Sequence, residues 1–123
     1  MPKTHIISIV DDDEAVRNAT KALIRSLGYQ VATFASAEDF LESDELHKTA
    51  CLISDVQMPG LNGIELQERL KADGHRIPII FITAFPDERV RANAMRGGAV
   101  SFMSKPFSDT TLIVCLDRAL QAA

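Results

Sequence analysis

The chain has 123 residues, of which 46% are hydrophobic and 24% are charged, and its formal net charge is −4. This length and composition predict one soluble globular domain over residues 1–123, with no room for a second core. The acidic balance gives no reason to expect direct binding of nucleic acid or of an anionic membrane. The short polar start of the chain resembles neither a signal peptide nor a membrane span, so a cytoplasmic protein is expected.

Five short apolar runs divide the chain, and a segment of helical composition follows each of them. The first, third and fourth runs are nearly continuous rather than alternating, which is typical of strands that are covered on both faces. The five predicted strands are His5–Val10, Gln30–Phe34, Ala50–Ser54, Ile77–Ile82 and Ala99–Met103.

Helical periodicity marks the segments that follow these strands. Gly28 is expected to end the first helix, and Ser36 is expected to cap a short second helix over Glu38–Leu41. The fourth helix, Asp87–Arg96, carries few large apolar residues. The apolar residues that mark the first, third and fifth helices are Val16, Ala19, Leu23 and Leu27, then Ile64, Leu66 and Leu70, then Leu112, Cys115, Leu116, Ala119 and Leu120.

Strand and helix therefore alternate five times, which predicts an α/β fold. Parallel strands joined by right-handed helical crossovers form an open, doubly wound, five-stranded sheet of order 2-1-3-4-5 with five helices, as in flavodoxin-like folds. In such folds ligands bind at the carboxyl ends of the strands. The side chains that follow each predicted strand are therefore the candidates for chemistry.

Reactive side chains follow four of the five predicted strands. They are Asp11, Asp12 and Asp13 after the first, Asp55 after the third, Thr83 after the fourth and Lys105 after the fifth. Any one of them alone would be an ordinary turn or surface residue. Together they have complementary chemistry, because clustered carboxylates need a cation, and hard oxygen ligands suit Mg²⁺ or Mn²⁺.

This set of residues predicts a site for phosphoryl transfer. A carboxylate such as that of Asp55 can act as a nucleophile and form an acyl phosphate. The three outer oxygens of a phosphoryl group would then contact the metal ion, the Lys105 ammonium and the Thr83 hydroxyl. The small Ala84 leaves room for the incoming group.

The cysteines and histidines are expected to take no part in this chemistry. Cys51 and Cys115 lie in apolar runs and are interpreted as buried core thiols rather than as a disulfide. His5, His47 and His75 are scattered without the spacing of metal ligands and are interpreted as surface or loop residues.

In this order and spacing, the residues resemble a response-regulator receiver domain of the CheY-like superfamily from end to end. The matching motifs are Asp11-Asp12, the run Ser54-Asp55-Val56-Gln57-Met58-Pro59-Gly60 followed by Asn62-Gly63, Thr83-Ala84, and Lys105-Pro106-Phe107. Arg17, Phe102 and the end of the last helix resemble the FixJ-like subfamily of two-component systems.

The resemblance implies a role for each matching position. Asp55 would receive a phosphoryl group from a sensor histidine kinase. Asp12, Asp55 and the backbone carbonyl of Gln57 would hold Mg²⁺, with Asp11 acting mainly through a metal-bound water. Lys105 would pair with Asp55 and later with a phosphoryl oxygen.

Two residues near these motifs carry further expectations. The family has a cis peptide bond before the proline that matches Pro106. Asp13 lies outside the family pattern and is expected in the first turn of a helix, where it complements the helix dipole.

The resemblance also implies a conformational switch rather than a metabolic enzyme. The Thr83 hydroxyl would move to the phosphoryl group, and Phe102 would move from an exposed to a buried position. This would alter the face of the fourth helix, fifth strand and fifth helix, roughly Asp87–Ala119, which would control a partner, a homodimer or the DNA-binding domain of a longer chain. Arg89, Arg91 and Arg96 are either part of that surface or simply a solvated helix face.

The domain would catalyse only its own phosphoryl transfer and a slow autodephosphorylation. Phe85 lies two residues after Thr83 and cannot position an attacking water, so spontaneous loss of the phosphoryl group is not expected to be especially fast.

Three alternatives stand beside this interpretation. A haloacid-dehalogenase-type phosphatase would use Asp11 as its nucleophile, since Asp11-Asp12-Asp13 has its D-x-D spacing, but Ala15 stands where that family has Thr or Val. A flavodoxin-like electron carrier shares the predicted architecture, but aspartates after the first strand would repel the phosphate of FMN. A receiver-like interaction module that takes no phosphate is disfavoured because every expected chemical position is filled.

Overall fold

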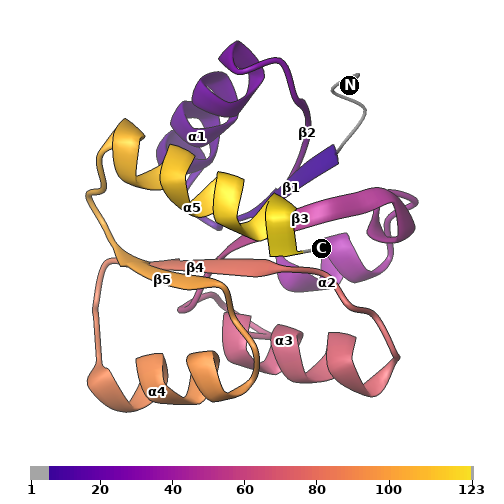
Figure 1. The fold of residues 1–123 in the computed structure, drawn as a ribbon. Coiled ribbons are helices and arrows are strands. Elements are labelled where there is room, and N and C mark those ends of the chain that lie inside the picture. The colour runs from indigo at the N-terminus through magenta and orange to yellow at the C-terminus, as the bar shows by residue number, and fades with distance from the viewer. Residues whose placement is uncertain (1–5, 123) are drawn as a thin grey trace.

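The computed structural model describes residues 6–122, which form a five-stranded parallel sheet with helices on both faces (Figure 1). The strands are β1 (Ile6–Val10), β2 (Gln30–Phe34), β3 (Thr49–Asp55), β4 (Ile79–Thr83) and β5 (Ser101–Ser104). The helices are α1 (Glu14–Ser26), α2 (Ala37–Leu41), α3 (Gly63–Ala72), α4 (Glu88–Arg96) and α5 (Asp109–Ala122), with a 3₁₀ turn, η1 (Leu46–Lys48), before β3. The strand order is β2-β1-β3-β4-β5, which confirms the predicted fold class. Within residues 6–122, no helix is long and apolar enough to cross a membrane.

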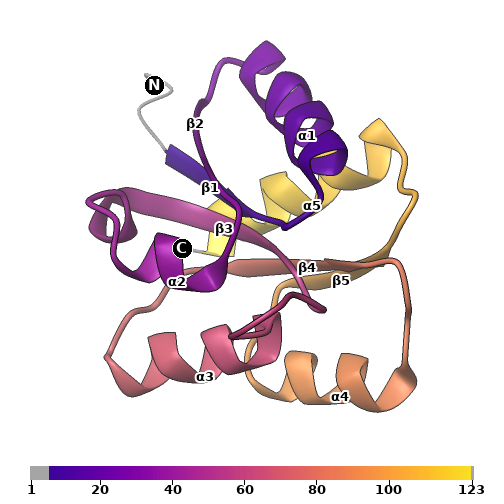
Figure 2. The ribbon, with the colours of Figure 1, turned by 180° about the vertical axis from the view of Figure 1, so that it is seen from behind.

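Two helical layers enclose the sheet, as Figures 1 and 2 show. α1 and α5 cover one face, and α2, α3 and α4 cover the other. The cluster under α1 and α5 includes both cysteines, which are buried free thiols as predicted. Burial, together with the neighbouring Cys115, raises the pKa of Cys51 to about 12, so this thiol stays protonated.

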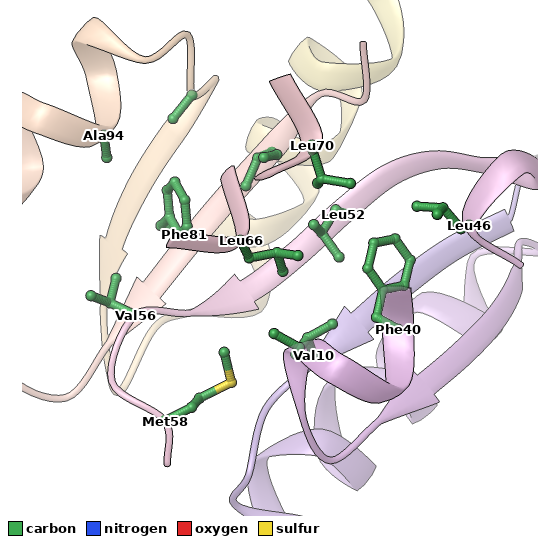
Figure 3. Packing of buried hydrophobic residues seen from close by; sticks show 13 residues of the cluster. Val10, Phe40, Leu46, Leu52, Val56, Met58, Leu66, Leu70, Phe81 and Ala94 are labelled. Atoms are coloured by element: carbon green, nitrogen blue, oxygen red, sulfur yellow. The ribbon is translucent and has the colours of Figure 1, made fainter. Parts of the chain in front are cut away.

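The cluster under α2, α3 and α4 lies directly beneath the loop that follows β3. Figure 3 shows its side chains from strands and helices packed together; those labelled are Val10, Phe40, Leu46, Leu52, Val56, Met58, Leu66, Leu70, Phe81 and Ala94. Phe40 also meets Phe34 edge-on, with ring centroids 5.4 Å apart. Because these rings and branched side chains fill the layer, the loop after β3 packs against a close-packed set of apolar side chains.

A buried polar contact joins α3 to α4 within this layer. The Gln67 side chain is 3% exposed, and its Nε2 donates a hydrogen bond to the carbonyl oxygen of Ala94, at 3.0 Å. The backbone of Gly97 lies against the same side chain, since a Cβ at Gly97 would be 2.6 Å from Oε1 of Gln67. The C-terminal end of α4 is therefore tied to α3.

Polar side chains determine where the helices beside the carboxyl edge of the sheet begin. Oδ1 of Asp13 accepts hydrogen bonds from the backbone N–H groups of Ala15 and Val16, at 2.9 and 3.2 Å. Asp13 is thus the N-cap of α1 rather than the first-turn residue that the sequence predicted. At α3, Asn62 and Glu65 form a capping box, with both side chain to backbone distances 2.9 Å.

Several strand boundaries differ from the prediction: β3 begins one residue earlier, β3, β4 and β5 each end one residue later, and β4 and β5 each begin two residues later. β4 begins at Ile79 rather than Ile77, because Pro78 has no N–H to donate to a neighbouring strand. β5 begins at Ser101 rather than Ala99, because the N–H of Ala99 donates to the last turn of α4 at 3.1 Å and prolongs the turn between the two elements.

The buried face of α1 is also rotated slightly from the predicted stripe. Thr20 and Ile24 are its buried residues, whereas Ala19 is exposed. Leu27 is the C-cap of the helix and Gly28 follows it with a φ of +96°, so the predicted glycine does end the helix. The capping serine of α2 is as predicted, since the Ser36 hydroxyl accepts a hydrogen bond from the backbone of the first turn.

Two histidines that the sequence treated as scattered lie together. The rings of His47 and His75 have centroids 5.2 Å apart and are tilted by 54°. They precede β3 and β4 respectively, so they lie at the amino ends of these strands, opposite the edge where the reactive residues gather. Separation in sequence concealed this contact, because parallel neighbouring strands bring their preceding loops side by side.

Candidate functional site

The candidate site lies at the carboxyl edge of the sheet, where four adjacent strands end. Asp55 is the last residue of β3 and Thr83 the last of β4, while Asp11 and Lys105 directly follow β1 and β5. Backbone hydrogen bonds between neighbouring strands extend to these positions. The N–H of Asp11 donates to the carbonyl of Phe34 on β2 at 3.1 Å, and the N–H of Lys105 donates to the carbonyl of Thr83 at 2.7 Å. The predicted gathering of these side chains is therefore a consequence of the strand order.

Lys105 bridges two carboxylates at the centre of the site. Its Nζ lies 3.0 Å from Oδ2 of Asp55 and 3.1 Å from Oδ2 of Asp11. Asp11 is fully buried, and the Lys105 side chain is 14% exposed, so solvent screens these charges weakly. The peptide bond between Lys105 and Pro106 is cis, as the resemblance implied.

Burial and neighbouring charges act on the pKa of Asp55 in opposite directions. Burial raises the pKa of Asp55 above its usual value, the hydrogen bond from Lys105 opposes this rise, and the charge of Asp11 adds to it. For Lys105, burial acts to lower the pKa, but the hydrogen bonds to Asp55 and Asp11 outweigh burial and raise it. The site is therefore short of positive charge even with its lysine protonated.

The carboxylates offer a set of oxygens that fits a hard divalent cation. One oxygen from each of Asp11, Asp12 and Asp55 lies within 4.8 Å of the others. Oδ1 of Asp11 accepts a hydrogen bond from the N–H of Asp13 at 2.8 Å, whereas its buried Oδ2 lies 3.1 Å from the Lys105 ammonium and has no other donor among the described residues. Buried carboxylate oxygens without a full set of donors are suited to Mg²⁺, which prefers oxygen ligands.

A shallow pocket of about 240 Å³ opens above Asp55. Its lining residues come from the loops after β1, β3, β4 and β5, and are Asp12, Asp13, Asp55, Gln57, Ala84, Phe85 and Lys105. Phe85 is 70% exposed at its rim, so one wall of the pocket is an apolar ring open to solvent. The predicted site residues Asp12, Asp55, Gln57, Ala84 and Lys105 thus share one cavity.

The Thr83 hydroxyl contacts the side chain of Gln57. Its Oγ1 lies 2.7 Å from Oε1 of Gln57 and accepts a hydrogen bond from the N–H of Phe85 at 3.0 Å. The resemblance marked Gln57 by its position two residues after Asp55 and by its backbone carbonyl, but it gave no indication of this side-chain contact. The conformation of the loop after β3, which brings its amide to the end of β4, is a tertiary feature.

Two further predicted residues lie beside the site. Nη1 of Arg17 donates a hydrogen bond to the backbone carbonyl of Asp11 at 2.7 Å, which fixes the loop after β1. Phe102 on β5 is half-buried rather than exposed, and its ring centroid is 6.4 Å from that of Phe81. The expectation of an exposed Phe102 is therefore wrong for this conformation, because the ring packs against the cluster under α2, α3 and α4.

The arginines of α4 lie on an exposed helix face. Arg89, Arg91 and Arg96 are all exposed. Arg91 makes an ion pair with Glu88 at 3.4 Å, one turn away on the same helix, and Arg96 donates to the side chain of Asn93. These are local surface contacts of small energetic value.

Comparison with known proteins gives a consistent answer. A family model described as the response regulator receiver domain matches residues 7–117. The response regulator protein TodT of Pseudomonas putida is 40% identical over 121 residues, covering 98% of this chain and 53% of TodT. The transcriptional regulatory protein FixJ of Bradyrhizobium diazoefficiens is also 40% identical over 121 residues, covering 98% of this chain and 58% of FixJ.

Solved structures agree with these sequence relatives. The structure of the response regulator StyR has a TM-score of 0.90 and 42% identity, with 97% of this chain and 60% of that chain covered. The present chain spans about half the length of the curated relatives it matches. A match over nearly the whole chain, with the acidic cluster, threonine and lysine at the strand ends, shows that the chain belongs to the response regulator receiver domain family.

Proposed function

We propose that this receiver domain is a phosphorylation switch in which the carboxylate of Asp55 accepts a phosphoryl group from a sensor histidine kinase. The observation that carries the proposal is the position of Asp55, which lies in the pocket at the end of β3 with Lys105 Nζ 3.0 Å away and two further carboxylates beside it. A nucleophile, a fixed cation and oxygen ligands for a metal are the parts that phosphoryl transfer needs.

In the proposed reaction, a carboxylate oxygen of Asp55 forms a bond to phosphorus. The bond between phosphorus and the imidazole nitrogen of the kinase phosphohistidine breaks, and the imidazole leaves with the electron pair and takes up a proton from water. The product is an acyl phosphate. Lys105, already paired with Asp55, neutralises one of the phosphoryl oxygens.

Asp11, Asp12, Asp55 and the backbone carbonyl of Gln57 would hold Mg²⁺ or Mn²⁺. The bound ion would supply the positive charge that the site lacks and reduce the repulsion between Asp55 and the incoming phosphoryl oxygens. Asp11 remains buried against Lys105 and orients the ammonium. Asp12 is exposed at the pocket, where it can reach a bound ion without further desolvation.

The proposed consequence is a change in the face formed by α4, β5 and α5. Thr83 would donate its hydroxyl proton to a phosphoryl oxygen, and the half-buried ring of Phe102 would move fully inward beside Phe81. That face would then control a partner, a homodimer or, in a longer chain, a DNA-binding output domain; one relative, FixJ, is a transcriptional regulatory protein. The domain itself acts as a switch and not as a metabolic enzyme.

Labelling with acetyl phosphate and Mg²⁺ tests this proposal. The chain should gain one phosphoryl group with the hydroxylamine sensitivity of an acyl phosphate, and Asp55→Asn should abolish the label. Asp11→Asn should still be labelled at Asp55, though more slowly. If Asp55→Asn were labelled and Asp11→Asn were not, the nucleophile would be Asp11 and the phosphatase alternative would replace the receiver mechanism.

The same samples test the proposed homodimer. Phosphorylated and unphosphorylated protein should elute differently in size-exclusion chromatography. Identical elution volumes, with the label on Asp55 verified by mass spectrometry, would contradict dimerisation and leave a different partner for the α4–β5–α5 face.

The exposed ring of Phe85 predicts that spontaneous loss of the phosphoryl group from Asp55 is not especially fast. Phe85 lines the pocket but has no group that can orient an attacking water. Phe85→Glu should therefore speed the loss of phosphoryl from Asp55 by about tenfold or more, because a positioned acid–base group contributes at least that much. Timing the decay after removal of acetyl phosphate measures the effect, and Phe85→Leu, which stays apolar, is the control. A decay that is unchanged or slower in Phe85→Glu would contradict this role.

A further inference from the structure

The hydrogen bonds at Thr83 define where its single hydroxyl proton goes. The N–H of Phe85 donates to Oγ1 of Thr83 at 3.0 Å, so this contact uses the threonine as an acceptor. Oε1 of Gln57, 2.7 Å from the same Oγ1, is a carbonyl oxygen and can only accept. Thr83 must therefore donate its proton to Gln57.

One end of this contact is buried. Thr83 is 1% exposed whereas Gln57 is exposed, so the bond joins a buried hydroxyl to a solvent-facing amide. The two residues are 26 positions apart, and the bond joins the loop after β3 to the end of β4. It thus connects the two loops on either side of the pocket above Asp55.

A phosphoryl oxygen on Asp55 would need the same proton. The proposed switch requires the Thr83 hydroxyl to donate to that oxygen, and a hydroxyl has only one proton to give. The charged phosphoryl oxygen is the stronger acceptor and prevails, but it has to displace the amide of Gln57. The Gln57 contact therefore opposes the switch and reduces the driving force for it.

We propose that the side chain of Gln57 is a positioning residue that holds Thr83 in the unphosphorylated arrangement and so sets the threshold of the switch. This inference rests on the proposed function of Asp55 and Thr83. It assigns to the Gln57 amide a role separate from that of its backbone carbonyl. Removing one neutral hydrogen bond of this kind is expected to shift the equilibrium between the two arrangements about fivefold towards the phosphorylated one.

The experiment uses beryllofluoride, which mimics a phosphoryl group on a carboxylate, at saturating Mg²⁺. NMR signals of the Thr83 methyl and the Phe102 ring follow the switch during the titration. Gln57→Met keeps an unbranched side chain of similar length but removes the carbonyl acceptor. The beryllofluoride concentration at the midpoint of the titration should be about fivefold lower for Gln57→Met than for the unmodified chain. Gln30→Met is the matched control, since it makes the same change at an exposed position at the start of β2.

A double-mutant cycle separates this role from a general effect on the loop. Thr83→Val keeps the shape of the side chain and removes the hydroxyl. If Gln57 acts through Thr83, Gln57→Met should no longer lower the beryllofluoride midpoint, measured by the Asp55 amide signal, in a chain that already carries Thr83→Val. A lowered midpoint that persists in that background would overturn the proposal.

The outcomes also separate the two proposals from each other. If the unmodified chain showed no beryllofluoride response at Asp55, the proposed function would fail. If it responded but Gln57→Met had an equal or higher midpoint, the function would stand and the role of Gln57 would fail. A higher midpoint would mean that the amide supports the phosphoryl group instead of holding Thr83 away from it.

Discussion

Gly63→Ala is expected to destabilise the fold by about 3 kcal/mol, although Gly63 is the first residue of a helix, where alanine is normally the better residue. A Cβ at this position would lie 2.3 Å from the backbone oxygen of Asp55, 3.0 Å from the Phe81 ring and 3.1 Å from Cα of Val56. Figure 3 shows Phe81 and Val56 in the packed layer below. Two of these three neighbours are backbone atoms, so relief requires the end of β3 to move.

Urea unfolding followed by circular dichroism measures this effect, since the chain has no Trp and one Tyr. Gly74→Ala is the matched control, because Gly74 has a φ of +81° but no atom within 4 Å of an added Cβ. The free energy of unfolding of Gly74→Ala should fall by about 1 kcal/mol, from backbone strain alone. A Gly63→Ala variant as stable as the unmodified chain, or one that loses less than Gly74→Ala, would show that the approach of α3 to Asp55 is not tight.

Lys105→Met is expected to lower the free energy of unfolding by about 2 kcal/mol at neutral pH in the absence of divalent cations. Methionine retains most of the apolar stem, so the loss comes from leaving the carboxylates of Asp11 and Asp55 without their cation. Added Mg²⁺ should restore part of the stability, because an ion that binds only the folded state stabilises it by mass action. Lys71→Met, at an exposed position on α3, is the control and should change little.

The loss in Lys105→Met should depend on pH in a defined direction. The pKa of Asp55 is already raised in the folded state, mainly by burial, and the hydrogen bond from Lys105 opposes the rise. Without Lys105 the pKa rises further. A group whose pKa is higher in the folded state contributes stability below its unfolded pKa and loses it as pH rises through the folded pKa. The stability of Lys105→Met should therefore be closest to that of the unmodified chain at acidic pH, where Asp55 is protonated. A loss that is equal at every pH and insensitive to Mg²⁺ would indicate lost packing instead.

The fold and most of the site could be predicted because both follow from patterns that are local in the sequence. Apolar runs alternating with helical segments predict a doubly wound parallel sheet, and the strand order of that fold brings Asp11, Asp55, Thr83 and Lys105 to one edge. Motif spacing then identified the family. None of this required knowledge of how any loop is folded.

The features that could not be predicted depend on loop conformation and on close packing. The contact between Gln57 and Thr83 arises only once the loop after β3 has folded over the end of β4. The tight approach of Gly63 to the backbone oxygen of Asp55 depends on how α3 packs against the end of β3. The half-buried position of Phe102 likewise reflects its neighbours in the α2–α4 cluster and not its own strand pattern.

The bond from Gln67 to the carbonyl of Ala94 limits the ways in which α4 can move. The C-terminal end of α4 is held to α3 by the buried Nε2 of Gln67, and the backbone of Gly97 lies against the same side chain. Its N-terminal end, at Glu88, begins shortly after Thr83 and lies in an exposed segment. A displacement of α4 that keeps the Gln67 bond is therefore a rotation about the C-terminal end, largest where the helix is nearest the site. A movement of Thr83 would therefore displace the N-terminal end of α4 at the surface, while the sheet and α3 remain in place.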